Sequence, residues 1–228
     1  MKQTAGLVMI LITAGLATSI ECGRKSETTN PVAGSAASSS VTSVPLSANV
    51  KPSGPEGAGE ANTTAKLAGA EWAMKQDQIK NDSNGQWAVS ATASSTYDDA
   101  KEIERWAANQ VTGAPNVEKY GDDGNAWAPK TEDAGMEWLD VTFANPVNAT
   151  EVRIRESCGS GTIIRIDLFD EQGVSHTVWA GVDPTTELNY LMITFPRTTY
   201  KTNRIKITLA TNVVQGWNEI DAIQLVGK

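Results

Sequence analysis

The chain has 228 residues, a formal net charge of −8 and an isoelectric point of about 4.8. This acidic balance offers no basic face that could neutralise phosphates, which argues against a nucleic-acid partner. The sequence has one histidine, His176, which excludes any site that needs two imidazoles, such as the zinc motif HExxH.

The chain begins with a stretch typical of an export signal, which we assign to residues 1–21. Lys2 supplies a positive charge, and the apolar run that follows is too short to span a bilayer comfortably. Two processing routes stay open. Cleavage at the small-x-small triplet 17–19 gives a soluble product, whereas Cys22 followed by Gly23 looks like the start of a bacterial lipoprotein, in which that cysteine carries the lipid. The flexible segment that follows slightly favours the lipoprotein.

The two cysteines, Cys22 and Cys158, leave a similar choice. In an oxidising compartment they can form one disulfide. That bond would join the leader to the folded body across a very long loop. Lipidation of Cys22 would instead leave Cys158 as a lone thiol, and we expect this unpaired state.

Residues 22–85 form a low-complexity linker. The first part is rich in Ser, Thr, Ala, Gly, Pro and Asn without an apolar period, so it cannot bury enough surface to offset its ordering entropy. Helix formers are more frequent toward its end, where we predict a short helix at 65–80 that packs on the main body.

Residues 86–228 contain a series of short alternating strands separated by turn residues. Apolar and polar residues alternate clearly in 137–143 and 204–209, with Leu139, Val141 and Phe143 inward in the first. We predict strands at 87–94, 137–143, 149–156, 162–169, 174–179, 190–195, 204–209 and 216–227. So many strands with almost no helix indicate an all-β domain, an antiparallel β-sandwich.

Antiparallel strands also fix where the connections lie. From residue 137 onward, successive connections alternate between the two ends of the sandwich. Segments 157–161, 181–189 and 211–216 then share one end with the long segment that leads into residue 137. We therefore expect ligand-binding loops at this end.

The last strand contains two acids, Glu219 and Asp221. Strict alternation places Glu219 on the same face as Ile223 and Leu225, where a carboxylate is costly unless a hydrogen-bond network or a cation compensates it. The alternative is a bulge near Asp221 that turns both acids to solvent, and the pattern alone slightly favours it.

Three blocks of the sequence resemble a known fold: WAVSATASSTY, then AWAPKTEDAGMEWLDVTFANPVNATEVRI, then TNRIKITLATNVVQGWNEIDAIQLVG. They are similar to the galactose-binding-domain-like jelly rolls, the fold of discoidin, the coagulation factor V/VIII type C domains and many carbohydrate-binding modules. The bacterial subgroup that resembles the pappalysin scarf domain is the closer match. The resemblance spans the whole folded part, residues 86–228, and implies a jelly roll.

The same resemblance implies one structural calcium ion, held between the first long loop and a Glu that opens the last strand. Glu219 matches that Glu, and the loop counterparts are Asn109, Gly113 and Asn116. Such oxygen ligands suit a hard cation. The Asp-Gly pair common in the family reads Thr112-Gly113 here, which lowers the ligand charge. Alternatively, Glu219 accepts backbone N–H groups of the loop directly and no metal is bound.

No set of nucleophile, base and acid can be assembled, and we expect a strand position for His176 far from the long loops. Loop acids could in principle pair for glycoside hydrolysis, although solvated surface is the better interpretation. These acids are Asp122, Asp123, Glu132, Asp133 and Asp183. Arg155 and Arg165 are expected on outward strand positions beside the Cys158 loop, where they could bind an acidic group.

For a binding module, Trp106 and Tyr120 offer ring faces to a sugar. The expected hydrogen-bonding partners are Asp122, Asp123, Asn125 and Asn212. Trp106 has a structural alternative, as an anchor that pins its loop to the core. Trp127, Trp138 and Trp217 are expected to be structural.

We therefore expect an exported, non-enzymatic binding module of the bacterial cell envelope that recognises a glycan or another cell-surface ligand. The only contact with the membrane would be a lipid on Cys22. The alternatives are an accessory domain that docks onto another envelope protein, and a hydrolase that uses loop carboxylates.

Overall fold

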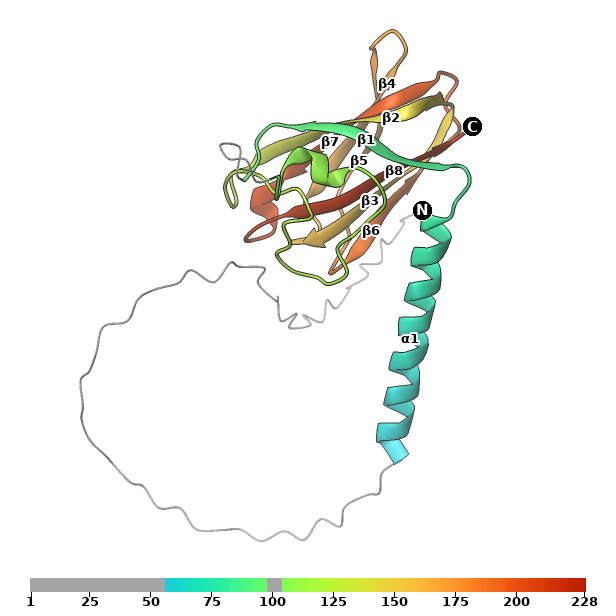
Figure 1. Ribbon diagram of the computed structural model, residues 1–228, viewed down its shortest axis with the longest axis vertical. Helices are drawn as coiled ribbons and strands as arrows, with labels where there is room; N and C mark the ends of the chain where they lie inside the picture. The colour runs from blue at the N-terminus through green and yellow to red at the C-terminus, as the bar shows by residue number, and fades with distance from the viewer. Residues whose placement is uncertain (1–55, 98–103) are drawn as a thin grey trace, which may run out of the picture.

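The computed structural model describes residues 56–97 and 104–228 (Figure 1). One α-helix precedes a domain made almost entirely of strands. The elements are α1 (Glu56–Lys80), β1 (Gly85–Ala93), the 3₁₀ helix η1 (Ala108–Val111), β2 (Met136–Val147), β3 (Ala149–Cys158), β4 (Ile163–Asp170), β5 (Ser175–Ala180), β6 (Asn189–Thr194), β7 (Thr202–Ala210), the 3₁₀ helix η2 (Thr211–Val213) and β8 (Glu219–Gly227).

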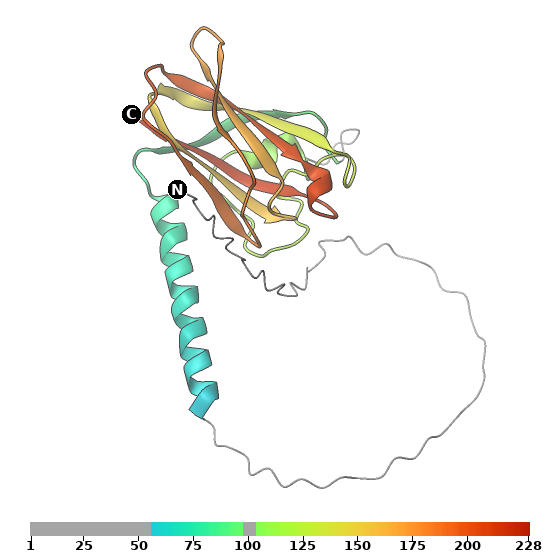
Figure 2. The same ribbon diagram turned by 180° about the vertical axis from the view of Figure 1, so that it is seen from behind.

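The strands form an antiparallel sandwich in which β1 belongs to both layers. Its first residues, Gly85–Trp87, pair with β8, and the rest of the strand pairs with β2. The order β5-β4-β7-β2-β1-β8-β3-β6 therefore runs through one layer, turns at β1 and continues through the other (Figures 1 and 2). Every pairing is antiparallel. The predicted all-β sandwich is confirmed, and its topology leaves β5 and β6 as the two edges.

The core lies between the two layers and follows the alternation of the sequence. Leu139, Val141 and Phe143 of β2 lie beside Ile205 and Ile207 of the paired strand β7, in one continuous cluster of buried side chains. Because successive side chains of a strand point to opposite faces, the polar residues between them lie outside. The inward positions predicted for these strands are confirmed.

The long connections meet at one end of the sandwich, which we call the long-loop pole. It comprises residues 104–135, 159–162, 181–188 and 211–218. Hydrogen bonds join these segments directly: the Gly159 N–H donates to the Tyr120 hydroxyl, the Ser160 hydroxyl to the Glu187 carbonyl, and the Gly216 N–H to Asp133. The predicted clustering of loops is confirmed, so the loops share one rigid base.

Helix α1 is longer than the predicted segment 65–80 and packs less on the domain. Figures 1 and 2 show it extending away from the sandwich. Only its C-terminal end is fastened: Ile79 is buried, and the Gln224 side chain donates to its carbonyl oxygen at 3.0 Å. Leu67 and Met74 are exposed. The expected packing of the whole helix on the body is therefore wrong, because its apolar residues do not form one stripe along the helix.

The structure of the last strand differs from both interpretations of Glu219 and Asp221, the inward carboxylate and the bulge that exposes both acids. Arg155 pairs with Ala222 and Glu156 with Ile220, so Asp221 is an extra residue in β8, a β-bulge. Ile220, Ile223 and Leu225 all reach the core. Glu219 thus does not share the face of Ile223, and the predicted bulge is present. However, neither acid reaches solvent, because the loops of the pole cover that face and leave each acid 1% exposed.

Cys158 is buried beside Ala128 and Trp217. It is disulfide-bonded, so the expectation of a lone thiol is wrong. The other cysteine, Cys22, lies outside the described residues, as does the whole segment 1–21.

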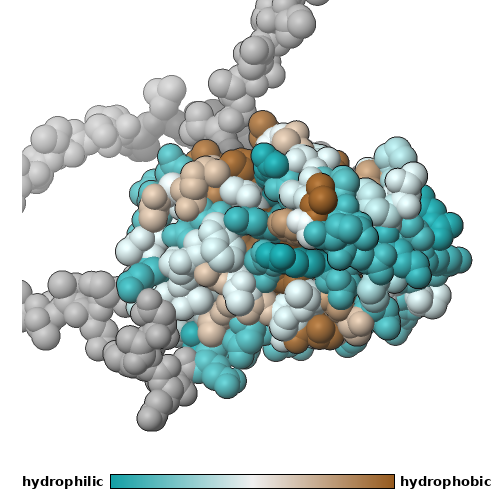
Figure 3. Space-filling view, turned by 90° about the horizontal axis from the view of Figure 1, so that it is seen from above, coloured by the Kyte–Doolittle hydropathy of each residue, from teal (hydrophilic) through white to brown (hydrophobic). Residues whose placement is uncertain are grey.

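The described part of the chain contains no helix that is both long and apolar enough to cross a bilayer. On the face shown in Figure 3, hydrophilic residues predominate and apolar ones are scattered. A large apolar interface is therefore not present on this face.

Two glycines give a test of how tightly the pole is packed. Gly159 (φ +53°) and Gly173 (φ +81°) both have left-handed backbone, but a Cβ on Gly159 would lie 2.2 Å from the Trp217 carbonyl oxygen, whereas none of the surrounding atoms lies within 4 Å of one on Gly173. We expect Gly173→Ala to cost about 1 kcal/mol for the left-handed backbone. Gly159→Ala should cost about 3 kcal/mol, because overpacking adds to that strain. Urea unfolding measures both, and equal losses would contradict the tight packing.

Candidate functional site

The two acids of β8 hold the long-loop pole together. Glu219 Oε2 accepts the Asp123 N–H at 3.0 Å, and Asp221 Oδ1 accepts the Asn116 N–H at 3.1 Å. The N–H of Val117 also points to Asp221, at 3.4 Å. The direct contact between a β8 carboxylate and loop N–H groups, which was the alternative to calcium, is therefore present. Asp221 and Glu219 divide this role between two parts of the loop.

Asp221 lies in a strongly desolvated position. Its Oδ2 is 3.5 Å from Arg155 Nε, and Arg155 also donates to the Val117 carbonyl. Burial raises the pKa of Asp221 to about 6, although the N–H groups and Arg155 oppose that rise. This acid therefore stabilises the loop at the cost of holding a charge away from water.

The four residues expected to bind calcium have other contacts. The Asn109 carbonyl accepts the N–H and the hydroxyl of Thr112, and the Gly113 N–H donates to the Ala88 carbonyl. Asn116 presents its N–H to Asp221. Since the loop directs donors rather than oxygens at the β8 acids, these contacts fit direct fastening better than a shared cation. Calcium binding by this set stays a prediction.

Trp106 belongs to an aromatic cluster that is centred on Tyr97. Tyr97 packs edge-on against both Trp106 and Trp217, with ring centroids 5.3 and 5.0 Å apart. The Trp106 indole N–H donates to Asp122 at 3.0 Å, and the Arg105 guanidinium lies 4.5 Å from the Trp106 ring. These contacts support the anchoring role of Trp106, whose ring remains partly exposed.

The other residues expected to bind ligand are distributed over the same pole. The Tyr120 hydroxyl accepts the Gly159 N–H at 3.0 Å. Asp123 Oδ1 accepts the backbone and side-chain N–H groups of Asn125. Asn212 is exposed on η2. The pole thus brings these residues to one end of the domain, and ligand binding by them stays a prediction.

The acids considered for hydrolysis hold turns. Asp133 accepts the Gly216 N–H, and Asp183 accepts the N–H groups of Thr185 and Ile163. Glu132 is exposed on the surface. His176 stacks on Tyr200 and bonds to Asp170 at the opposite end of the sandwich. This geometry does not assemble a general acid and base at one place.

The two arginines expected on the outside have different surroundings. Arg155 is buried, so its outward exposure was predicted wrongly: residues 115–118 cover that face of the sheet, and Arg155 bonds to the Val117 carbonyl. Arg165 is half-exposed on β4, in the other layer, where it pairs with Asp167 at 2.8 Å. They do not form one anion site.

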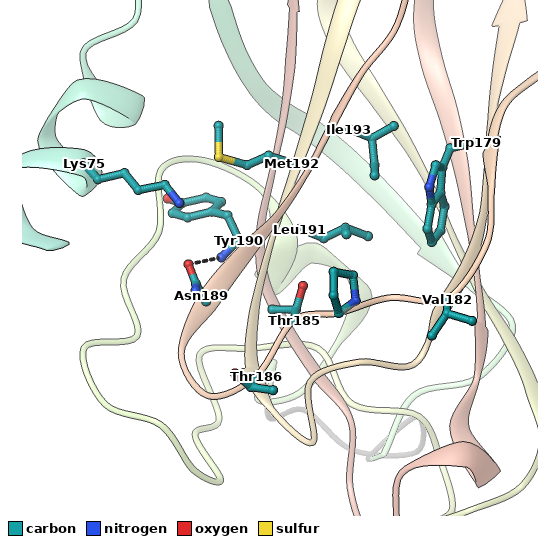
Figure 4. Close-up of a pocket in the computed structure, with 11 residues that line it drawn as sticks. Lys75, Trp179, Val182, Thr185, Thr186, Asn189, Tyr190, Leu191, Met192 and Ile193 are labelled. Atoms are coloured by element: carbon teal, nitrogen blue, oxygen red, sulfur yellow. Dashed lines mark hydrogen bonds between the residues drawn. The ribbon is translucent and has the colours of Figure 1, made fainter. Parts of the chain in front are cut away.

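A pocket of about 450 Å³ lies where the 181–188 loop meets edge strand β6 (Figure 4). Trp179 lines it from β5, and Leu191 and Ile193 line it from β6. Tyr190 and Met192, which alternate with them along β6, also border the pocket. Figure 4 shows the Lys75 side chain extending from α1 toward Tyr190. The pocket thus follows the open edge of β6.

Polar groups line the same pocket from the loop and from the first residue of β6. They belong to Thr185, Thr186 and Asn189. Asn189 Oδ1 accepts the Tyr190 N–H at 2.9 Å, which fixes the Asn189 side chain. An aromatic and apolar wall beside a few oriented polar groups is the usual composition of a small-ligand site.

The sequence profile of the pappalysin-1 SD scarf domain, C-terminal, matches residues 76–228. The chain belongs to this family. The match covers the end of α1 and the whole sandwich, so the predicted resemblance to the pappalysin scarf domain is confirmed.

Solved structures with a similar fold include three carbohydrate-binding modules. Chitosan-binding module 1 of a Paenibacillus sp. IK-5 chitosanase/glucanase is 15% identical with a TM-score of 0.45, and covers 60% of this chain and 94% of its own. The family 32 module of C. perfringens NanJ, solved with galactose, is 17% identical with a TM-score of 0.43. The alignment covers 62% of this chain and 98% of that module. A pectin-binding module is 16% identical with a TM-score of 0.42. The alignment covers 61% of this chain and 91% of that module. No match to the chain was found among curated proteins.

Sequence reasoning missed the pocket of the scarf domain. Trp179 and Tyr190 are far apart in the order of strand pairing, and no local pattern indicates that β5 and β6 become the two sheet edges. One signal was available for the loop. Asp183-Pro184-Thr185 is typical of a turn in which the Asp side chain accepts an N–H two residues later, and Asp183 does accept that of Thr185.

Replacement of Asp221 by Asn tests the cost of the buried acid. The pKa of Asp221 is about 6 in the folded protein against an ordinary 3.8, so the native state binds the proton more tightly. Its stabilising contribution is therefore complete below the ordinary pKa and is lost as the pH rises through the folded pKa. We expect the unfolding free energy of the wild type to fall by about 2–3 kcal/mol relative to Asp221→Asn between about pH 4 and pH 7. Urea unfolding across this range measures it, and parallel profiles would show that Asp221 titrates normally.

Proposed function

We propose that this scarf domain is an exported, non-enzymatic binding module that recognises a glycan in the pocket between the 181–188 loop and β6. The observation that carries the proposal is the composition of that pocket: the Trp179 ring, the apolar side chains of β6, and the polar side chains of Thr185, Thr186 and Asn189. A sugar presents an apolar ring face and several hydroxyls, so it needs such a pair of surfaces.

The position of Trp179 supports this role. Its ring packs partly against the core and partly over Gly181, where an added Cβ would lie 3.2 Å from the ring. The glycine leaves room for the indole at the mouth of the pocket. The ring is therefore fixed before a ligand arrives, which lowers the entropic cost of binding.

Export is the second part of the proposal, and it rests on residues 1–21 of the sequence. The disulfide at Cys158 suits an oxidising compartment. Cys22 cannot both carry a lipid and pair with Cys158. We therefore propose that the product begins after the small-x-small site and is secreted or periplasmic, with the lipid-anchored envelope form as its alternative. The intact mass of the mature protein distinguishes them.

A docking domain for another envelope protein is the second candidate. The open edges of β5 and β6 favour it, because an edge strand can accept a further strand from a partner. Val182, which is 90% exposed beside this edge, adds an apolar contact. Co-purification of a protein partner without any glycan signal would support docking.

The binding prediction concerns Trp179. A glycan array identifies a ligand, and calorimetric titration with that ligand then compares variants. We expect Trp179→Ala to bind about 10- to 100-fold more weakly, because the stacking surface is lost, and Trp179→Phe to retain most of the affinity.

Trp138→Ala is the matched control. This ring lies on the outside of β2 under Lys206, 4.6 Å from the Lys Nζ, and does not line the pocket. Trp106→Ala tests the aromatic cluster of the pole as the rival surface. If Trp106→Ala abolishes binding and Trp179→Ala does not, the pocket is not the glycan site.

A further inference from the structure

Two carboxyl groups meet beneath the 181–188 loop. Glu156 lies near the end of β3 and Asp183 lies in the loop, and the two side chains interact with each other. They are 1% and 6% exposed. Both acids also contact the turn 159–163. Glu156 Oε2 accepts the Gly161 N–H at 2.8 Å, and Asp183 Oδ2 accepts the Ile163 N–H at 3.3 Å.

Several oxygens of this cluster have no hydrogen-bonding partner. Glu156 Oε1 and the Thr185 hydroxyl are buried and lack a hydrogen bond, as does the hydroxyl of Thr162 in the same turn. The Thr185 hydroxyl lies close enough to Glu156 to favour its charged form, although it lacks hydrogen-bond geometry. The carbonyl oxygens of Thr185 and Asp183 lie 3.2 and 3.6 Å from a Cβ position on Gly161. The cluster is therefore rich in oxygen.

In the part of the chain that the structure describes, neither acid of the cluster is paired with a basic side chain. Burial and the neighbouring Asp183 raise the pKa of Glu156 well above its ordinary value. Two buried carboxylates in contact are stable only if a proton or a cation lies between them.

We propose that Glu156 and Asp183 bind a hard divalent cation, with calcium as the best fit, and that Thr185 contributes oxygen to the same site. Carboxylates, hydroxyls and carbonyls are the ligands that calcium prefers, and its flexible coordination tolerates a site made by a strand end and a loop. This site is separate from the one that the family resemblance implies at Glu219, and it does not depend on glycan binding.

A cation here would fix one wall of the pocket. Asp183, Pro184, Thr185 and Thr186 are consecutive, and the last three line the pocket. Joining Asp183 to β3 through a cation anchors the loop to the sheet. The pocket would then keep its shape only while the cation is bound.

The test is thermal melting of the chelator-treated protein with added calcium or magnesium at neutral pH. At calcium concentrations about 100-fold above the dissociation constant, we expect the melting temperature of the wild type to rise by about 5–10 °C. Glu156→Gln and Asp183→Asn should lose this rise. Asp167→Asn, which removes an equally buried acid that pairs with Arg165, should keep it.

The metal-free variants provide the second measurement. Glu156→Gln removes the repulsion between the two acids, so without metal it should melt at or above the wild-type temperature. A calcium response that disappears only in Glu219→Gln would overturn the proposal and favour the β8 site. Absence of any response in the wild type would also overturn it, and would assign a shared proton to the pair.

Discussion

The structure of the long-loop pole depends on the burial of two carboxylates in β8. Glu219 and Asp221 lie in a strand that is covered on both faces, where a charged oxygen is stable only if hydrogen bonds or an opposite charge compensate it. The N–H groups of Asp123 and Asn116 supply those bonds. Each bond satisfies an acid and also fixes a loop. The burial of each acid and the position of its loop therefore depend on each other, because the same loop covers the carboxylate and donates to it.

Carboxylates accept backbone N–H groups of turns elsewhere in the domain as well, which explains how an acidic chain can have ordered loops. Asp133, Asp170 and Asp183 each accept backbone N–H groups of a turn. A net charge of −8 would otherwise spread repulsion over the surface. Here many of the acids serve as acceptors for N–H groups that secondary structure leaves unpaired. Loops held in this way do not need to order when a ligand binds, which favours recognition by a preformed surface.

Local pattern predicts most of the sandwich because the two-residue period of a strand is local. The inward sets of β2 and β7 follow directly from it. The period fails at Asp221, where one extra residue shifts the faces of β8, so the face of Glu219 could not be deduced from its spacing to Ile223. The location of the pocket could not be predicted for a different reason. Trp179 and Tyr190 line one pocket only because the packing of the two layers brings the edge strands β5 and β6 near each other, which is a property of the whole topology.

The position of the pocket also limits what the domain can recognise. Its aromatic and apolar wall belongs to the sheet edges, which packing holds rigid, whereas its polar wall belongs to the 181–188 loop and to Asn189 at the start of β6. Specificity for a sugar depends on hydroxyl partners at fixed positions, because an unpaired buried polar group costs about 1–3 kcal/mol. Asp183 fixes this loop by accepting the N–H groups of Thr185 and Ile163, and the proposed cation would add a link to Glu156 on β3. In the proposed glycan site, discrimination between sugars therefore falls to the polar wall, because Trp179 offers a similar apolar face to each of them.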